Sequence, residues 1–533
     1  MVEQVGLPPE IKASQRYKAL EQGRQGFLAR ARECAALTIP AIMPPQGFGP
    51  TSQLPTPYQS LGARGVRTLA SKLLLALFPS FPFFNYRIDD LSLNKLGEKR
   101  GEVEILLAAR ERAVNTELET SVFRPVAFQT LLHLVTTGNG LLRIPENPDE
   151  RSQFFRLDQY VTRRDAAGNL LEFVIHQPID FTSLPLEIQQ ELVKVDPYKS
   201  RVPNSMQPEP VDLFTHGYWD ADKQRWFTYQ EAAGIRLPGT LGVYKQGELP
   251  YLALRFSSQP GEDYGRSYVE EYLGDLDSLE ALSETLVEGS AASAKIVFLV
   301  DPAGTTSLQV IEKAKTGDVR SGRAQDVTVM QVQKQADLQV AKAQAEEIAN
   351  RLAYAFLLHS SIQRDGERVT AEEIRFMASE LDDGLGGVYT LLAADFQLPA
   401  VRLFERRMEK RLGASKLPEN MVKPVIVAGL EAIGRGHEQA NLRMFVQEII
   451  GTLGPELALR YLNPLELMNR SAAAYGIDTA NLLRTEEEIA QAEQIAQIQM
   501  LIQHLGPEGL KQAGSLAQAA VQNGSAPNVP SAR

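Results

Sequence analysis

The chain has 533 residues, of which 44% are hydrophobic and 23% are charged. At about 150 residues per domain, this length predicts about three or four domains with sizeable hydrophobic cores. Acidic residues outnumber basic ones by 66 to 55, and the formal net charge of −11 argues against a protein that binds nucleic acid through a generally basic surface. The single cysteine, Cys34, excludes an intrachain disulfide and a cysteine-based zinc or iron–sulfur cage.

The chain carries no pattern typical of a membrane or secreted protein. Its longest apolar stretch, from Leu73 to Phe84, is interrupted by Pro79, Ser80 and Pro82. A transmembrane helix needs about 20 apolar residues, so this stretch is too short to span a bilayer. Residues 1–10 lack a basic segment followed by an apolar one, so we expect no signal peptide.

Helical periodicity dominates the first part of the chain. It predicts helices over residues 11–36, 61–79, 102–120 and 125–137, the last of which ends at a cluster that begins with Gly138. The clearest apolar face belongs to the helix 61–79 and consists of Val66, Leu69, Leu73 and Leu77.

Short apolar runs separated by turn residues follow, and they predict strands. A hairpin is expected at residues 165–169, because Gly168 and Asn169 tolerate positive φ angles. The region up to about residue 262 is therefore predicted to be α+β. The expected strands cover residues 141–144, 155–163, 170–176, 211–219 and 225–229.

Two long helices with a short insert between them are predicted next. The first begins at a capping box, in which the Ser267 hydroxyl accepts from the amide of Glu270 and the glutamate accepts from the cap amide, and it is expected to reach residue 295. The second is predicted over residues 337–359. The insert contains β-like runs at 296–300 and 327–332 and a basic, glycine-punctuated stretch at 314–323.

The last third is predicted to be helical, apart from its tail. After a polar break at 360–368, a second capping box at Thr370 starts a long helix that is interrupted at residues 384–387 and again at Pro399, so we expect a kinked rod. Residues 424–500 predict a further helical domain. The tail from residue 506 is poor in hydrophobic residues and is predicted to be disordered.

None of these elements carries a catalytic constellation. The chain holds no G-x-x-x-x-G-K-[ST] phosphate loop, which excludes an ATPase of the P-loop type. The six histidines are scattered, and no two have the spacing of a zinc site, so no metal and no cofactor are expected. The basic residues at 313–323 are either phosphate contacts or part of a solvated loop, and the residues alone leave both readings open.

Five segments, in this order, resemble the head-to-tail connector, or portal, proteins of short-tailed podoviruses of the autographivirus type. The likeness extends over about residues 10 to 480, and long collinear motifs make chance agreement a poor explanation. The segments are LGARGVRTLASKLLLALFP (61–79), YGRSYVEEYLGDL (264–276), QKQADLQVAKA (333–343), GERVTAEEIR (366–375) and GLEAIGRG (429–436).

The resemblance implies a mostly α-helical α+β portal fold, assembled as a ring of twelve copies, with parts known as wing, stem, clip and crown. Residues 1–262 and 371–423 would then form the wing, with the long kinked helix in the second segment. Residues 263–295 and 337–359 would be the two stem helices. The clip would be 296–336, the tunnel loop 360–370, the crown 424–505 and the tail 506–533.

The resemblance also implies partners and contact residues. Double-stranded DNA would pass through the channel, with terminase and then a tail adaptor bound at the clip. The major capsid and scaffolding proteins, and internal core proteins at the crown, would be further partners, with no membrane contact. The protein would be assembled in the host cytoplasm and reside at a capsid vertex of the virion. The implied contacts are Lys313, Lys315, Arg320 and Arg323 in the clip and Gln363, Arg364 and Arg368 in the tunnel loop.

Two other classes of protein are alternatives. One is a DNA-processing enzyme such as the packaging motor itself, against which the absent phosphate loop argues. The other is a scaffold or pore-forming protein without a DNA role, for which an exposed amphipathic membrane segment would be the discriminating feature. We find no such segment in the sequence, so a non-enzymatic portal is the preferred interpretation.

Overall fold

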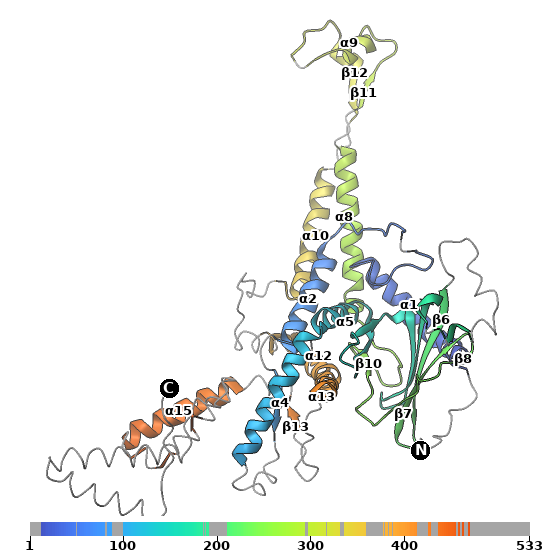
Figure 1. The fold of residues 1–533 in the computed structure, drawn as a ribbon. Helices are drawn as coiled ribbons and strands as arrows, with labels where there is room; N and C mark the ends of the chain where they lie inside the picture. The colour runs from blue at the N-terminus through green and yellow to red at the C-terminus, as the bar shows by residue number, and fades with distance from the viewer. Residues whose placement is uncertain are drawn as a thin grey trace, which may run out of the picture. The chain divides into compact units, whose positions relative to one another are not determined.

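The structure is a computed structural model, and its chain forms two compact units, Met1–Gly436 and His437–Arg533. Figure 1 shows the course of the chain. The residues that the structure describes are 12–49, 51–79, 83–87, 100–184, 210–293, 297–315, 317–330, 335–358, 387–412, 425–427 and 435–454, with single positions between 186 and 190, 377 and 385, and 457 and 468.

The four helices expected in the first part of the chain are all present. They are α1 (Ala13–Ala36), α2 (Leu61–Leu77), α4 (Arg100–Thr120) and α5 (Phe123–Thr137). The predicted face of α2 is fully buried in the main hydrophobic core, where α2 packs against α5. The turn after α5 is made by Gly138, whose φ of 74° favours a residue without a side chain. Periodicity therefore located both ends of each of these helices to within two residues.

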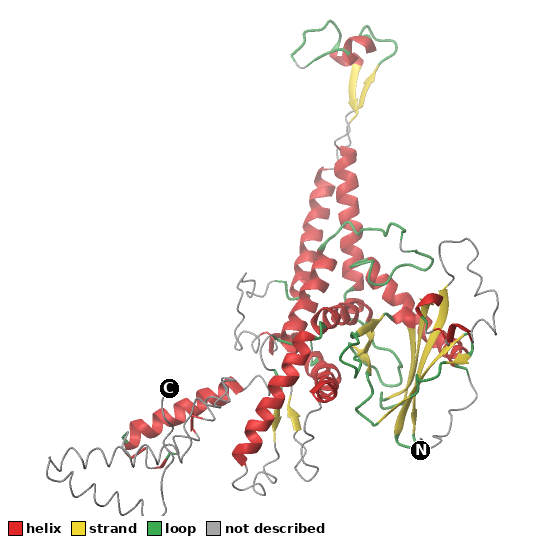
Figure 2. Cartoon of the chain, in the orientation of Figure 1, coloured by secondary structure: helices red, strands yellow, loops and turns green. Residues whose placement is uncertain are grey.

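The largest sheet of the first unit is antiparallel and has six strands, and α1 packs on it (Figures 1 and 2). The expected hairpin joins β4 to β5, with Gly168 at a φ of 88°. A second sheet pairs β10 (Tyr251–Arg255) with β2 (Asn139–Arg143) and β2 with β3 (Gln153–Phe155). The strands of the first sheet are β4 (Tyr160–Arg164), β5 (Leu170–Asp180), β6 (Pro210–Asp220), β7 (Arg225–Ala232), β8 (Ile235–Arg236) and β9 (Gly242–Tyr244).

The prediction of one strand over residues 155–163 is wrong. The chain leaves β3 at Phe155, makes a 3₁₀ turn over Leu157–Gln159 and enters the other sheet as β4. The cause is the buried guanidinium of Arg24 on α1, whose Nη1 donates to the carbonyls of Leu157 and Tyr160 at 3.1 and 2.8 Å. These carbonyls therefore point at a helix and are not available to a neighbouring strand.

The first long helix is divided in two. Ser267 caps α7 (Tyr268–Glu271) as expected, by accepting from the Glu270 amide at 2.9 Å. The glutamate does not complete the capping box, because its carboxylate pairs with Arg266 and Arg30. Tyr272 then departs from helical geometry, and α8 (Leu273–Ser293) continues from there. Its neighbour α10 (Gln335–Ala355) lies alongside it.

The insert between α8 and α10 contains the two expected strands. They are β11 (Val297–Val300) and β12 (Val327–Met330), which pair antiparallel, with Val300 opposite Val327. A short helix, α9 (Leu308–Glu312), lies between them in the chain. The basic stretch follows α9.

The long helix of the last third departs from α-helical geometry at Gly387, as expected, and again just before Pro399. Gly387, with a φ of 85°, precedes α12 (Val388–Leu392), and a π-helical turn over Ala393–Gln397 leads into α13 (Leu398–Leu412). Pro399 has no amide hydrogen, and its ring crowds the carbonyl of Asp395 four residues earlier. The helix widens at this point and is not broken.

A buried ion pair joins α13 to α4. Arg407 and Glu117 are both 4% exposed, and Nε of the arginine lies 2.8 Å from the carboxylate. Arg407 also donates to the backbone carbonyls of Pro148 and Glu150 in the loop after β2. The pair therefore holds two helices and a loop together within the core.

The segment assigned to the crown begins within the first unit. Val425–Val427 form β13, which pairs antiparallel with β1 (Asn85–Arg87), so the prediction of helix from residue 424 is wrong at these residues. Beyond it the structure describes α15 (Arg435–Leu453), in the segment where the sequence predicts helix. The tail from residue 506 lies outside the described residues.

Candidate channel and partner-binding surfaces

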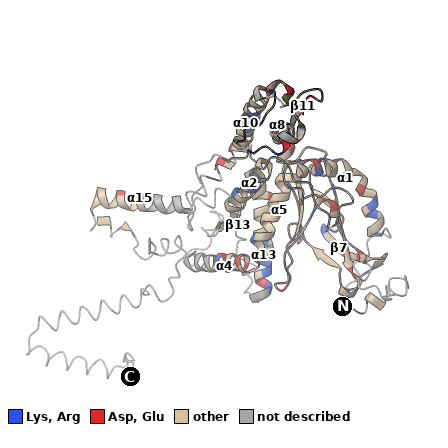
Figure 3. Ribbon diagram, turned by 90° about the horizontal axis from the view of Figure 1, so that it is seen from above, with Lys and Arg blue, Asp and Glu red and all other residues tan. Residues whose placement is uncertain are grey.

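The helix pair α8–α10 carries an excess of negative charge. Helix α8 has five carboxylates and no lysine or arginine, and α10 adds three carboxylates against two cations. Only one ion pair links the two helices among the described residues, between Arg351 and Asp275 at 3.1 Å. Figure 3 shows acidic residues in red and basic ones in blue. The carboxylates of α8 are Asp275, Asp277, Glu280, Glu284 and Glu288.

A glycine of α8, Gly289, makes a close contact with α10. A Cβ on Gly289 would meet Cδ2 of Leu338 at 2.9 Å, closer than real Cβ atoms approach. At the other end of the pair, Leu276 of α8 and Leu352 of α10 are completely buried. The pair is therefore packed along its length and is not held by charge alone.

The C-terminal end of α10 is anchored by two other elements, α2 and α7. Phe356 is fully buried, and its ring packs so close to α2 that a Cβ on Gly65 would meet it at 2.6 Å. The hydroxyl of Tyr268 on α7 donates to the carbonyl of Ala355 at 2.8 Å. Nζ of Lys72 on α2 donates to the carbonyl of Leu357 at 2.8 Å. The point where the chain leaves α10 is therefore fixed.

Lys72 also reaches the chain after the predicted tunnel loop. Its Nζ lies 3.8 Å from a carboxylate oxygen of Glu380, and burial lowers the pKa of the lysine while this carboxylate opposes the shift. Gln363, Arg364 and Arg368 lie outside the described residues, so their role stays a prediction. Lys72 itself was missed by sequence reasoning, although a lysine within an apolar helical run was a usable signal.

The four predicted clip residues lie on one stretch of the chain, residues 313–323, which we call the clip loop. Lys313, Lys315, Arg320 and Arg323 are all exposed. Arg320 forms an ion pair with Asp318 at 2.7 Å. No salt bridge joins the other three to any residue that the structure describes. The clip loop therefore presents cations to solvent.

The base of the clip loop is held by one carboxylate. Asp326, just before β12, accepts from the amide and hydroxyl of Thr305 and of Thr306, at 2.9 to 3.2 Å. The hydroxyl of Thr306 in turn accepts from the amide of Arg323 at 2.9 Å. These hydrogen bonds, from Thr306 first, lower the pKa of Asp326, so it stays ionised.

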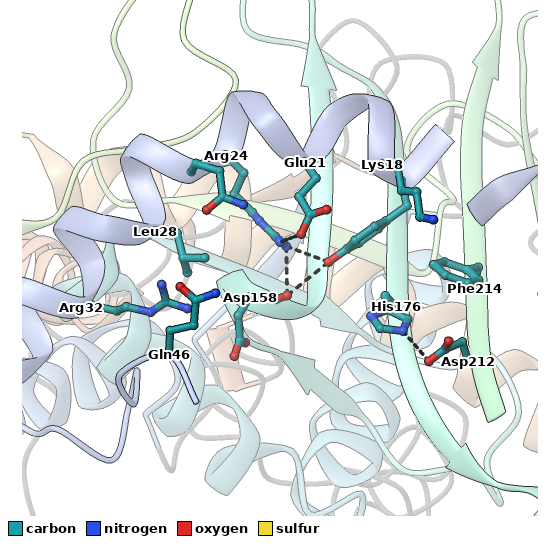
Figure 4. Close-up of a pocket in the computed structure, with 12 residues that line it drawn as sticks. Lys18, Glu21, Arg24, Leu28, Arg32, Gln46, Asp158, His176, Asp212 and Phe214 are labelled. Atoms are coloured by element: carbon teal, nitrogen blue, oxygen red, sulfur yellow. Dashed lines mark hydrogen bonds and ion pairs between the residues drawn. The ribbon is translucent and has the colours of Figure 1, made fainter. Parts of the chain in front are cut away.

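A shallow pocket of about 400 Å³ lies beside α1 (Figure 4). Arg24 lines this pocket but is only 2% exposed, and its guanidinium already donates hydrogen bonds to the carbonyls of Leu157 and Tyr160. On the opposite side, Nε2 of His176 lies 2.9 Å from Asp212. Cations and carboxylates are balanced on the lining, so it selects no ligand charge, and we assign it no ligand.

The buried carboxylate of Glu172 in the sheet is bound by side chains of the same chain. Glu172 on β5 is bound by Arg16 of α1 at 2.6 Å and by His216 of β6 at 2.9 Å. Burial favours its neutral form, but the hydrogen bonds from His216 and Arg16 outweigh burial and lower the pKa of Glu172 to about 2. This cluster fixes α1 on the sheet, so we assign it a structural role.

The described part of the chain contains neither a cluster of metal ligands nor a helix suited to span a membrane. Within it, no three His, Cys, Asp or Glu side chains gather closely enough to hold a metal ion. None of the helices there is both long and apolar enough to cross a membrane.

Comparison with known proteins identifies the family. The family described as bacteriophage head to tail connecting protein matches residues 10–483. The portal protein of Escherichia phage T7 is 39% identical over 495 residues, covering 91% of this chain and 90% of the relative. The portal protein of Enterobacteria phage T3 is also 39% identical, covering 90% and 89%. The chain belongs to the family of bacteriophage head-to-tail connecting proteins.

A solved structure with some likeness is the neck of a native gene transfer agent particle, computed with C12 symmetry. The TM-score is 0.31 at 13% identity, covering 78% of this chain and 90% of the other. Family membership, which rests on the sequence relatives, gives the chain the role of a portal protein, a head-to-tail connector and component of the virion. It favours this role over a packaging enzyme or a scaffold without a DNA role.

Proposed function

We propose that the chain assembles with copies of itself into a ring of about twelve subunits at one capsid vertex, and that α8 and α10 line its channel. Residues 1–262 and 371–423 form the wing in this proposal, 296–336 the clip and 424–505 the crown. Double-stranded DNA passes through the channel during packaging and ejection. The ring itself is a conduit and no enzyme.

The observation that carries the proposal is the acidic surface of the helix pair. A channel wall that made many phosphate contacts would hold DNA tightly and would have to release each contact as the duplex advanced. Carboxylates such as Glu284 and Glu288 repel the backbone instead. The wall then confines the duplex without binding it.

The ends of this channel have distinct roles in the proposal. The clip loop contacts terminase during packaging and the tail adaptor afterwards, through Lys313, Lys315, Arg320 and Arg323. The major capsid and scaffolding proteins surround the wing, and internal core proteins sit on the crown. Gln363, Arg364 and Arg368 reach the channel and contact passing phosphates.

Electron microscopy and native mass spectrometry of the purified protein test the ring. We expect closed rings of eleven to thirteen subunits, since overexpressed rings vary in closure number, with a central channel wide enough for duplex DNA. Monomers or dimers at all concentrations would refute the proposal. Rings in which α8 and α10 lie on the outer surface would leave the ring intact but remove the channel assignment.

The tunnel-loop assignment has its own test. Replacing Arg364 and Arg368 by alanine should leave ring assembly and capsid incorporation unchanged, while filled heads lose DNA before the tail attaches. Glu367→Gln should improve retention slightly, because it removes a carboxylate that competes for the same arginines. DNA content of mutant heads is measured over time after packaging. Retention equal to wild type in the double variant would show that the arginines do not touch the genome.

A further inference from the structure

Two exposed arginines on α2 have no carboxylate partner within the described part of the chain. Arg64 and Arg67 are exposed, and no salt bridge joins either guanidinium to a residue that the structure describes. Helix α2 contains no aspartate or glutamate, and its third cation, Lys72, is buried and donates to the carbonyl of Leu357. The exposed face of α2 therefore carries positive charge that the described residues do not neutralise.

An exposed tyrosine lies at the same level as these arginines, on the other side of the packed helices. Tyr354 on α10 is 78% exposed, although Phe356, two residues later, is fully buried and packs against Gly65 of α2. Successive residues of an α-helix are about 100° apart, so Tyr354 points away from α2. By the same geometry Arg67, two residues after Gly65, points away from α10. Each subunit therefore presents Arg67 and Tyr354 on opposite sides, at one height along α10.

Carboxylates lie at the level of Tyr354. Arg351, one turn earlier on the same face of α10, pairs with Asp275 of α8 at 3.1 Å. Glu271, one turn before Asp275 in the chain, is exposed and forms no salt bridge with a described residue. Burial, followed by the charge of Glu270, raises the pKa of Glu271. A cation brought to this level is therefore attracted to it.

We propose that Tyr354 of each subunit packs against Arg64 and Arg67 of its neighbour, and that this contact closes the ring. The inference rests on the proposed function and names the surface that binds a second copy of the chain. A rotation about the channel axis, along which α8 and α10 run in that proposal, leaves the height of every residue unchanged. Two surfaces that meet around such a ring lie at equal heights on opposite sides of the subunit, as these two do.

The side chains suit a contact between subunits. A guanidinium stacks on the face of a tyrosine ring, and the attraction grows as water is excluded. Tyrosine and arginine are also among the residues that contribute most to protein interfaces. Nucleic acid fits Tyr354 less well, because the carboxylates of Asp275 and Glu271 at the same level repel phosphates. A second copy supplies the two halves of the contact from one sequence.

Cross-linking between subunits tests the contact directly. Cys34, the only cysteine in the sequence, is buried, so introduced thiols are the reactive ones. In assembled rings of the double variant Tyr354→Cys, Arg67→Cys, a short bifunctional maleimide should join subunits into covalent oligomers on a denaturing gel. The matched control is Val340→Cys with Arg67→Cys. Val340 is 60% exposed and lies about 21 Å further along α10, so the control should give monomers only.

Replacement of the tyrosine gives an independent measurement. Tyr354→Ala should raise the subunit concentration at which native mass spectrometry detects rings by about tenfold or more. Tyr354→Phe keeps the aromatic face and should assemble like wild type. Arg64→Ala combined with Arg67→Ala should weaken assembly in the same way as Tyr354→Ala. Circular dichroism should show that each variant is folded, because these side chains are exposed.

Several outcomes would overturn the inference. One is assembly of Tyr354→Ala like wild type, and another is the absence of covalent oligomers from rings of the cysteine pair. Normal rings of Tyr354→Ala that no longer bind terminase, a tail adaptor or DNA would assign the tyrosine to that partner instead. Failure of the wild-type chain to form rings would refute the proposed function itself, and native mass spectrometry of the wild type distinguishes this result from the others.

Discussion

Arg407 in α13 and Arg320 in the clip loop each pair with one carboxylate, at opposite levels of solvent exposure. The side chains of Arg407 and Glu117 are 4% exposed, whereas those of Arg320 and Asp318 are 49% and 35% exposed. The buried pair must be complete, because either charge alone would lie in a medium that solvates it poorly. The exposed pair is solvated whether or not it is complete, so charged side chains in its region can bind other molecules.

The same contrast separates the helical core from the clip loop as a whole. We use helical core for α2, α4, α5 and α13 and the residues packed on them. There, glycines mark close contacts and cations are held by carbonyls or carboxylates. In the clip loop all four cations are exposed, and only Arg320 forms a salt bridge with a described residue. The four predictions below test this difference, from the largest expected effect on folding to the smallest.

Arg407→Met should produce the largest loss of stability. It leaves the Glu117 carboxylate buried and removes the donor from two backbone carbonyls, and breaking a buried pair in this way costs about 3–5 kcal/mol. Urea denaturation of the purified protein measures the change. Arg320→Met is the control and should leave the urea midpoint unchanged. Equal effects of the two variants would contradict the comparison.

Gly65→Ala should destabilise the contact between α2 and the end of α10. The added Cβ would meet Cγ of Phe356 at 2.6 Å, and overpacking of this kind costs about 1–3 kcal/mol. Gly26→Ala in α1 is the matched control. No atom lies within 4 Å of its added Cβ, so a gain of about 0.4–1 kcal/mol is expected from the less flexible unfolded chain. Thermal melts of both variants measure the change: the melting temperature should fall for Gly65→Ala and rise for Gly26→Ala, and a rise in both would contradict the prediction.

His133 should make the fold sensitive to mild acid. Burial on α5, aided by the charge of Arg156, lowers the pKa of His133 to about 3, against about 6.5 in the unfolded chain. Between about pH 3 and pH 6.5 the His133 side chain is protonated in the unfolded chain but neutral in the folded one. The stability that neutral His133 contributes is therefore complete above about pH 6.5 and is lost as the pH falls.

The loss attributable to His133 is about 2 kcal/mol at pH 5. Urea midpoints at pH 7 and pH 5 should differ less in His133→Gln than in the wild type. An identical difference in both proteins would mean that another group carries the pH dependence. Glu172, with its pKa lowered to about 2, contributes a further loss only below about pH 4.3.

Charge reversal in the clip loop should have the smallest effect on folding and a large one on assembly. Changing Lys313, Lys315, Arg320 and Arg323 to glutamate removes no buried contact, so the urea midpoint and ring formation should not change. Docking of terminase or of the tail adaptor should be blocked, because like charges then face each other. Mutant rings that package DNA and join tails normally would exclude the clip loop as a docking site.

Local pattern was sufficient for elements whose structure depends on neighbours in the chain. The face of α2 formed by Val66, Leu69 and Leu73 is buried as its spacing predicts, because helical periodicity needs no other segment. The Ser267 cap and the 165–169 hairpin are correct for the same reason. Collinear motifs added the family, which no single element could have shown.

Tertiary structure determined the local conformation wherever a distant segment supplies the hydrogen-bond or ion-pair partner of a polar group. The sequence of residues 155–163 predicts one strand. The strand is interrupted because Arg24, over a hundred residues away in the chain, donates hydrogen bonds to two carbonyls of this segment. The glutamate of the capping box is diverted by Arg266 and Arg30, and Lys72 is tolerated inside α2 because the end of α10 brings it a carbonyl. A buried polar group is stable only with its partner in place. Composition and periodicity identify the group but not its partner. The sequence by itself therefore determined the first four helices, the Ser267 cap and the family, whereas packing decided which charges are buried and which are exposed.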